Sequence, residues 1–96
     1  MSAENRSSDS VRHNEAKCRF EVGSPGNPAH LDYLVVGTSM EIYHTEVPGQ
    51  YQGQGLAGKL ATAGLDWARE HGFKVITSCS YATSFVAKHP EYQDLL

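Results

Sequence analysis

The chain of 96 residues has room for one domain, and its formal net charge is −3 at neutral pH. This charge, together with the lack of any run of Lys or Arg, excludes the electrostatic footprint of a nucleic-acid-binding protein. No apolar stretch is long enough to cross a bilayer or to form the core of a signal peptide. Two cysteines make no disulfide framework, and the five histidines lack metal-ligand spacing, so we expect no metal site and a reducing, cytoplasmic environment.

The first 14 residues are almost entirely polar or charged. Such a stretch cannot bury enough apolar surface to offset the entropy of ordering, so residues 1–14 are predicted to be a disordered leader. The folded domain would then span residues 15–96, about 80 residues, a size that is only modestly stable alone. A monomer or a weak homodimer is therefore expected.

Three strands are predicted before the first helix. Residues 17–22 alternate between apolar and charged, residues 30–36 are rich in Leu, Tyr and Val, and a dense run of turn formers separates them at 23–28. The short turn at 37–39 predicts that residues 40–47 pair back on 30–36 as an antiparallel hairpin. Strict alternation along this third strand places four side chains on one face: Met40, Ile42, His44 and Glu46.

A long amphipathic helix is predicted from about residue 54 to residue 71. Gly58 and Gly64 lie inside it, either for close packing on the sheet or to leave room for a ligand. A fourth strand at 73–79 should run parallel to the third because an entire helix intervenes, and a shorter helix follows at 80–89. The predicted order is β-β-β-α-β-α, an α+β fold whose mixed sheet has about four strands.

The loop that joins the third strand to the long helix, residues 47–57, has the sequence VPGQYQGQGLA. Its glycines, and the free backbone N–H groups at the positive end of the helix dipole, make a site for a phosphate or pyrophosphate. The G-x-G-x-x-G match at 53–58 is not a dinucleotide site, because antiparallel strands come first and no acidic residue lies about 20 positions on. A Walker P-loop is excluded because no Lys-Ser/Thr pair follows the glycines.

One step earlier, the segment Gln50-Tyr51-Gln52-Gly53-Gln54-Gly55 resembles the Q/R-x-x-G-x-G/A motif of the GNAT superfamily of N-acetyltransferases. In that family the motif opens a long helix, and its backbone amides bind the pyrophosphate of acetyl-CoA. The predicted order of elements resembles the family as well. The resemblance implies that acetyl-CoA is the acyl donor and that it is bound by Val47, Gln50, Gln52, Gly53, Gln54, Gly55, Leu56 and Ala57.

The segments 44–48, 51–57 and 79–81 together are similar to compact, single-domain GNAT-like proteins of roughly a hundred residues. The likeness covers about residues 16–96. Full-size GNATs have two helices between their first two strands, and here only residues 23–29 fill that gap. The resemblance therefore implies an open acceptor side, which suits a protein or peptide amine, or a pocket completed by a second subunit.

Three side chains are the main candidates for the chemistry. Cys79 ends the last strand just before a helix N-terminus, a setting that favours a thiolate. The resemblance implies that it is a nucleophile forming an acetyl-cysteine, and the alternative is an ordinary buried cysteine. Glu46 ends the third strand, where the family often carries a general base, and His44 shares its face and could take the same role. A solvated Glu46 and a core-bonded His44 are the alternatives, and Tyr81 is a further candidate, as acid for the departing CoA thiolate.

Three functions stay open from the sequence. The leading hypothesis is an acetyl-CoA-dependent N-acetyltransferase that moves an acetyl group to an amine, directly or through Cys79. The second is a non-catalytic acetyl-CoA-binding module, suggested by the missing acceptor helices. The third is a protein-interaction domain whose glycine loop is only a tight turn. Binding of CoA separates the third hypothesis from the others, and replacement of Cys79 and Glu46 separates the first from the second.

Overall fold

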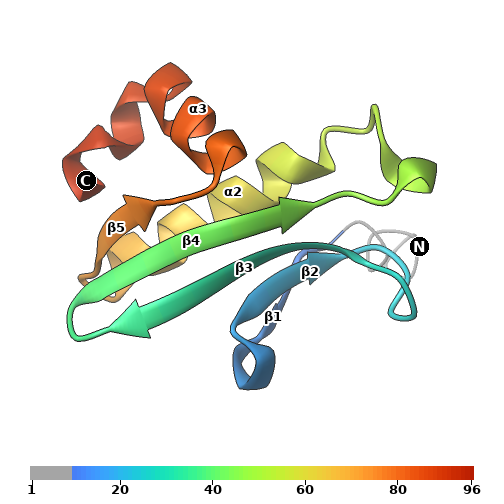
Figure 1. The fold of residues 1–96 in the computed structure, drawn as a ribbon, viewed down its shortest axis with the longest axis horizontal. Helices are drawn as coiled ribbons and strands as arrows, with labels where there is room; N and C mark the ends of the chain where they lie inside the picture. The colour runs from blue at the N-terminus through green and yellow to red at the C-terminus, as the bar shows by residue number, and fades with distance from the viewer. Residues whose placement is uncertain (1–9) are drawn as a thin grey trace, which may run out of the picture.

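The computed structural model describes residues 10–96, and these form a five-stranded sheet, two α-helices and three short 3-10 segments (Figure 1). In chain order the elements are β1 (Arg12–Asn14), η1 (Glu15–Lys17), β2 (Arg19–Val22), β3 (Ala29–Val36), β4 (Ser39–Glu46), η2 (Gly49–Tyr51), α2 (Leu56–Glu70), β5 (Lys74–Thr77), α3 (Ser80–Lys88) and η3 (Pro90–Leu95). Within this part of the chain, no helix has the length and apolar character needed to cross a membrane.

The strands lie side by side in the order β1-β2-β3-β4-β5. Neighbours from β1 to β4 are antiparallel, and β5 runs parallel to β4 because α2 carries the chain back between them. The predicted α+β fold with a mixed sheet is confirmed. The sheet has one strand more than the roughly four that the pattern predicted.

The additional strand, β1, lies inside the stretch predicted to be a disordered leader, and this corrects the prediction for residues 12–14; residues 1–9 lie outside the described part of the chain. A three-residue polar strand has no readable periodicity, and tertiary contacts hold it in place. The His13 ring stacks on Phe20 with centroids 4.1 Å apart and meets the edge of Trp67 at 4.9 Å. Its Nε2 lies 2.5 Å from the Tyr33 hydroxyl.

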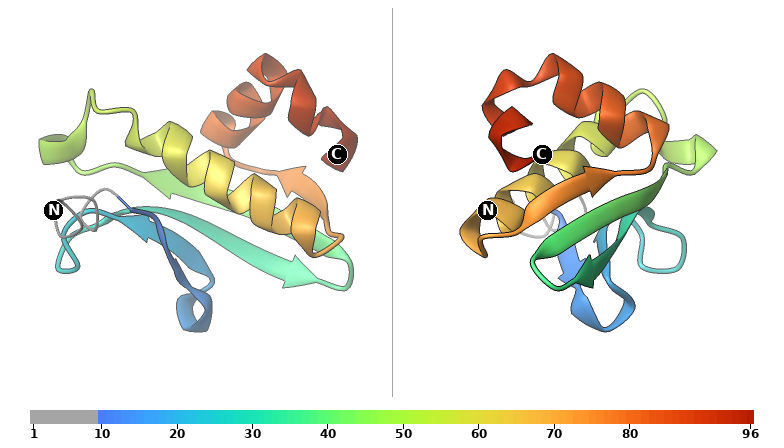
Figure 2. Two further views of the ribbon diagram at one scale, coloured as in Figure 1. Left: turned by 180° about the vertical axis from the view of Figure 1, so that it is seen from behind. Right: turned by 60° about the vertical axis from the view of Figure 1, so that its left-hand side comes forward.

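One face of the sheet carries the core, and α2 lies across it (Figure 2, left). Gly64 of α2 faces this sheet closely: a Cβ there would lie 3.5 Å from Leu31 and 3.7 Å from Met40 and Phe20. Close packing therefore explains Gly64. The buried apolar side chains of α2 and of the sheet, with those of α3, are Phe20, Val22, Ala29, Leu31, Tyr33, Met40, Ile42, Leu56, Leu60, Ala61, Leu65, Ala68, Val75, Ala82, Phe85 and Val86.

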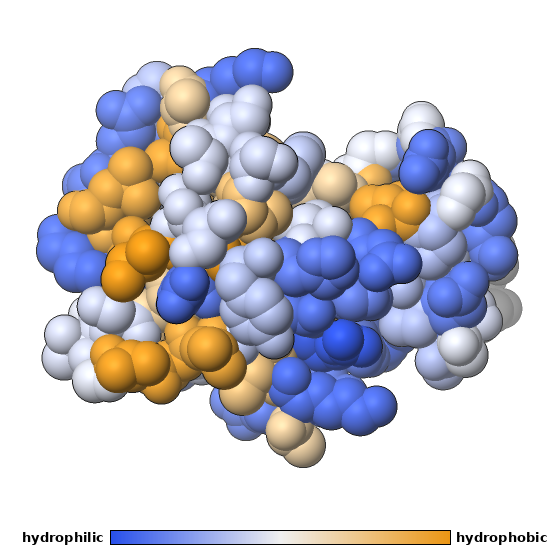
Figure 3. Space-filling model, in the orientation of Figure 1, coloured by the Kyte–Doolittle hydropathy of each residue, from blue (hydrophilic) through white to orange (hydrophobic). Residues whose placement is uncertain are grey.

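The opposite face of the sheet, which we call the open face, is turned toward the viewer in Figures 1 and 3. In Figure 3 apolar colour gathers around the hairpin end of β3 and β4 and around β5, whereas polar colour covers the other end. Leu34, Val36 and Ile76 are all exposed there, Val36 to 71%.

A β-bulge at Tyr43 interrupts the alternation along β4. Tyr33 pairs with Ile42, but the next residue of β3, Asp32, pairs with His44, so Tyr43 has no partner of its own. The predicted face of Met40, Ile42, His44 and Glu46 is therefore wrong beyond Ile42. Thr45 joins the core side, opposite buried Leu31, while His44 and Glu46 lie on the open face. A strictly periodic pattern cannot reveal one extra residue, because the bulge shifts every side chain that follows it.

Candidate functional site

The candidate site lies where β4 and β5 part. The parallel ladder ends at Ile42 and Thr77, with one further bond from the Ser78 N–H to the Ile42 carbonyl at 2.9 Å. Beyond that point β4 continues to Glu46, whereas the segment that follows β5 turns into α3 at Cys79. The end of β4, the loop after it and the start of α3 therefore surround one place.

The loop after β4 owes its shape to two glycines. Gly53 and Gly55 have φ values of +83° and +74°, a left-handed backbone that side chains other than glycine rarely adopt. A Cβ at either position would meet nothing within 4 Å, so the requirement for glycine comes from the backbone and not from crowding. Gly55 is the N-cap of α2, no side chain caps this helix, and its first turn holds no acidic residue. Its first N–H groups are thus available to an anion.

A hollow of about 340 Å³ opens over this helix end. Six of the eight predicted cofactor-binding residues line it: Val47, Gln52, Gly53, Gly55, Leu56 and Ala57. The other two, Gln50 and Gln54, do not line the hollow, and the Gln54 Nε2 donates to the Gln50 carbonyl at 3.4 Å. Gly58 lines it too, and a Cβ there would lie 3.7 Å from the Tyr81 hydroxyl, so this glycine both lines the hollow and permits close approach of α3.

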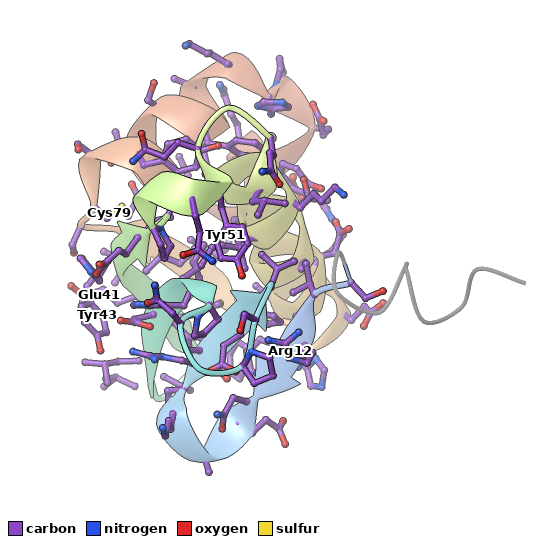
Figure 4. All side chains as sticks on the ribbon, turned by 90° about the vertical axis from the view of Figure 1, so that its right-hand side faces the viewer. Arg12, Glu41, Tyr43, Tyr51 and Cys79 are labelled. Carbon is purple, nitrogen blue, oxygen red and sulfur yellow. The ribbon has the colours of Figure 1, made fainter. Side chains whose placement is uncertain are left out.

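Two tyrosines, Tyr51 and Tyr81, complete the hollow, and neither was predicted to be a cofactor-binding residue. The Tyr51 hydroxyl accepts a hydrogen bond from the Ser24 N–H at 2.6 Å, and its ring covers Gly23, so the β2–β3 loop is tied to the glycine loop (Figure 4). Tyr81 stands in the first turn of α3. Burial, with a smaller effect of Cys79, raises the pKa of Tyr81 above 10, so its phenol keeps its proton at neutral pH.

Cys79 is the N-cap of α3, and its side chain is half-buried. Its Sγ accepts from the Ala82 N–H at 3.4 Å and lies 3.5 Å from the Thr45 Oγ1. The thiol is thus held at a helix N-terminus, as the sequence predicted, and it also lies beside β4. Thr45 was missed because strict alternation would have turned it away from the core side, and only the bulge brings it to the sulfur.

The other two predicted catalytic residues come together, but on the open face. His44 Nε2 lies 3.2 Å from Glu46 Oε1, and the two side chains are 49% and 59% exposed. They lie across β4 from Thr45 and Cys79, so the strand separates the thiol from the carboxylate and the imidazole. Figure 4 views the molecule from the end of the loop, with Glu41 and Tyr43 on the open face to the left and Cys79 above them.

Further charged residues of the open face were not singled out from the sequence. Asp32 accepts from Arg19 Nε at 2.9 Å and lies 3.0 Å from His30 Nδ1. His30 stands opposite Glu46 in the β3–β4 ladder, with Nε2 3.8 Å from Glu46 Oε1. His30 and Asp32 lie two residues apart on β3, so alternation alone places them on one face. Arg19 and Glu46 come from the two neighbouring strands, and only the pairing register brings them to this pair.

Known proteins resemble this chain in sequence, and one solved structure resembles it in fold as well. Residues 19–95 match the family described as GCN5-related N-acetyl-transferase. Protein NATD1 of Mus musculus is 36% identical over 83 residues, which cover 83% of this chain and 76% of that protein. Protein NATD1 of Danio rerio is 34% identical over 87 residues, 85% of this chain and 79% of that protein. A GCN5-like protein from Staphylococcus aureus, solved by NMR in solution, has a TM-score of 0.75 at 33% identity and covers 93% of this chain and 88% of its own. This chain therefore belongs to the GCN5-related N-acetyltransferase family.

Proposed function

We propose that this protein is an acetyl-CoA-dependent N-acetyltransferase that acts on the amine of a protein, a peptide or another large acceptor. One observation carries the proposal: the uncapped N-terminus of α2, formed by two left-handed glycines, opens into a hollow that also reaches Tyr81 at the start of α3. Family membership supports the reaction class. The geometry supports separate roles for the glycine loop, for the start of α3 and for the open face.

The hollow suits the diphosphate part of acetyl-CoA. The first backbone N–H groups of α2 lack intrahelical partners, and the helix dipole adds positive potential at the same end. No acidic side chain in the first turn of α2 repels an anion. Gln52 keeps the loop in shape through a 3.2 Å bond from its Nε2 to the Val47 carbonyl. The pyrophosphate oxygens would therefore receive backbone hydrogen bonds without reorganisation of the loop.

The thioester would lie between the end of β4 and the start of α3. In the route through Cys79, the thiol gives up its proton to solvent, the sulfur attacks the acetyl carbonyl carbon, and the bond from that carbon to the CoA sulfur breaks. The departing CoA thiolate takes a proton from the Tyr81 phenol, which burial keeps protonated, and solvent restores the phenol. An amine nitrogen then attacks the acetyl-cysteine and releases the Cys79 sulfur. In the direct route the amine attacks the CoA thioester, and Cys79 only lines the site.

The acceptor would approach from the open face. Its ammonium must lose a proton before the nitrogen can attack, and Glu46 and His44 are the bases on that face. The nitrogen would then reach the acetyl group through the opening where β4 and β5 part, beyond Ile42 and Thr77. The β2–β3 connection is short, residues 23–28, and Tyr51 holds it against the glycine loop. No helix pair of the described chain therefore shields the open face, which leaves room for a large acceptor.

An amide NMR titration tests the cofactor. Acetyl-CoA should shift the resonances of the glycine loop and of residues 79–81, while NAD at the same concentration should not. Intact-mass analysis of the acetyl-CoA-treated protein should then show one added acetyl group that is absent in Cys79→Ala. If millimolar acetyl-CoA leaves the amide spectrum unchanged, the transferase proposal is wrong.

A second candidate function, a non-catalytic acetyl-CoA-binding module, is favoured by the uncovered open face. It predicts the same amide shifts and no transfer. A pool of short peptides, each with either a free α-amine or a single lysine, separates the two functions. Product that disappears in Glu46→Gln while acetyl-CoA affinity stays unchanged supports the transferase. Tight acetyl-CoA binding without any product supports the binding module.

A further inference from the structure

Asp32 is the one charged side chain of residues 10–96 that is buried, with 6% exposure, although it lies on the open face. Arg19 and His30 cover it from the two neighbouring positions. Burying a carboxylate is costly unless its charge is paired and hydrogen-bonded. Arg19 supplies both, with contacts at 2.9 Å and 3.4 Å to the two oxygens. The pairing with Arg19 explains why Asp32 is tolerated, but it leaves the contact with His30 unexplained.

The contact with His30 determines which ring nitrogen carries its hydrogen. An ionised carboxylate only accepts hydrogen bonds, so the Nδ1 atom, 3.0 Å from Asp32 Oδ1, must be the donor. In the neutral imidazole the lone pair is then on Nε2. That atom faces Glu46 Oε1 at 3.8 Å. His30 therefore presents a proton acceptor to the side chain that we propose as the base.

His44 approaches the same oxygen from the other side. Its Nε2 lies 3.2 Å from Glu46 Oε1 and acts as a donor by the same argument. Both imidazoles thus face Glu46 Oε1. Within the part of the chain that the structure describes, Glu46 Oε2 receives no hydrogen bond. Glu46 is 59% exposed, so Oε2 is the oxygen that an acceptor ammonium can reach.

We propose that His30, oriented by Asp32, is a positioning residue that supports Glu46 as the base by receiving the proton that Glu46 removes from the acceptor. The inference rests on the proposed transferase function. The ammonium N–H bond breaks, its electron pair stays on nitrogen for attack on the acetyl group, and the proton goes to Glu46. Because the proton arrives on Oε2 and His30 Nε2 faces Oε1, the exposed Glu46 carboxyl turns about its last bond and delivers the proton to the lone pair of His30 Nε2. The imidazolium that forms faces a carboxylate at each nitrogen, Asp32 and Glu46, which stabilises it.

The other charged groups around this chain of side chains come from β2 and β1. Arg19 pairs with Asp32 and lies 3.9 Å from Glu21 Oε2, and Glu21 stands opposite His30 in the ladder. Arg12 is directed to the Gly23 carbonyl at 2.8 Å. Glu21 is therefore a suitable control. Its carboxylate stands on the strand position opposite His30, and none of the hydrogen bonds or ion pairs described here joins it to either ring nitrogen.

The first test is the tautomer of His30, read from long-range ¹H–¹⁵N imidazole spectra of the full chain with acetyl-CoA added. The neutral ring should carry its hydrogen on Nδ1 in the wild type and in Glu21→Gln. Asp32→Asn should lose that preference. A neutral His30 with its hydrogen on Nε2 in the wild type would overturn the proposal.

The second test is His30→Asn, which separates positioning from a structural role. The Asn Nδ2 can replace His Nδ1 as donor to Asp32, so the variant should unfold at nearly the wild-type temperature, but it has no nitrogen facing Glu46. With the peptide pool, kcat should fall about tenfold while KM for acetyl-CoA stays unchanged. Wild-type kcat in a folded His30→Asn protein would remove the proposal and leave the transferase intact. A wild-type protein that binds acetyl-CoA but acetylates no peptide would remove the transferase and the relay together, whereas the tautomer result would still stand.

Discussion

The glycine loop and the charged cluster of the open face both flank β4, yet they are built in different ways. The loop is one continuous segment whose proposed function rests on backbone N–H groups and two left-handed glycines. The cluster of Arg19, His30, Asp32, His44 and Glu46 takes side chains from three strands. A sequence records the first kind of site directly. It records the second only through strand register, which one extra residue can change.

The largest effect should come from Cys79, where the two regions meet across β4. If transfer passes through an acetyl-cysteine, Cys79→Ala should lower acetylation of the peptide pool at least about 100-fold and leave acetyl-CoA affinity unchanged. Cys18→Ala, at the other cysteine, is the control and should keep its activity. A Cys79→Ala protein with near wild-type turnover would show direct transfer. The loop and the open face would then act on the thioester without a covalent step.

Deleting Tyr43 tests whether the bulge is needed for chemistry or only for register. The ladder pairs Tyr33 with Ile42 and Asp32 with His44, so removal of the unpaired residue leaves both pairs in place. We expect a folded protein, destabilised by about 1 kcal/mol. Turnover should fall about tenfold, because a bulge bends its strand and re-aims the side chains beyond it.

Deleting Glu41 instead is the matched control for that experiment. It has its own partner in the ladder, so its loss shifts buried Met40 out of register with Val35. Circular dichroism should show loss of cooperative unfolding in this variant and not in the Tyr43 deletion. If both deletions unfold the protein, the bulge is part of the folding core and the two regions cannot be separated in this way.

Substitution of a loop glycine should have a smaller effect, which comes from the backbone conformation alone. Gly55→Ala places a side chain on a residue with φ of +74°, which should cost about 1–2 kcal/mol of stability and weaken acetyl-CoA binding. Gly49→Ala, in the same loop, meets open space and needs no left-handed backbone, so it should be close to neutral. Urea unfolding and calorimetric titration measure the two effects. Equal results for both variants would mean that loop conformation does not limit binding.

These cases show how far sequence patterns carry and where they stop. The order of elements and the mixed sheet followed from periodicity and from a helix long enough to be a crossover. The lining of the hollow followed from one local motif. The placement of Thr45, His44 and Glu46 could not be derived, because the bulge at Tyr43 leaves no mark on composition. The Asp32–His30 pair follows from alternation within β3, but its position beside Glu46 depends on the register of β3 with β4, which the bulge sets.

The smallest expected effect concerns β1, the strand that periodicity missed. Burial, helped by nearby His71 and opposed by Glu15, lowers the pKa of His13 below its usual 6.5. Between the folded and unfolded pKa values the unfolded chain binds more protons. The contribution of His13 to the free energy of unfolding is therefore complete above pH 6.5 and is lost as the pH falls below it.

Urea unfolding at pH 7 and at pH 5 measures this loss of stability. The loss should be smaller in His13→Phe, which keeps the stack on Phe20 but cannot titrate. Amide exchange should report the same loss first in β1, while the glycine loop, which depends on no histidine, keeps its protection. An equal pH dependence in both proteins would mean that β1 is held by its ladder with β2 rather than by the His13 ring.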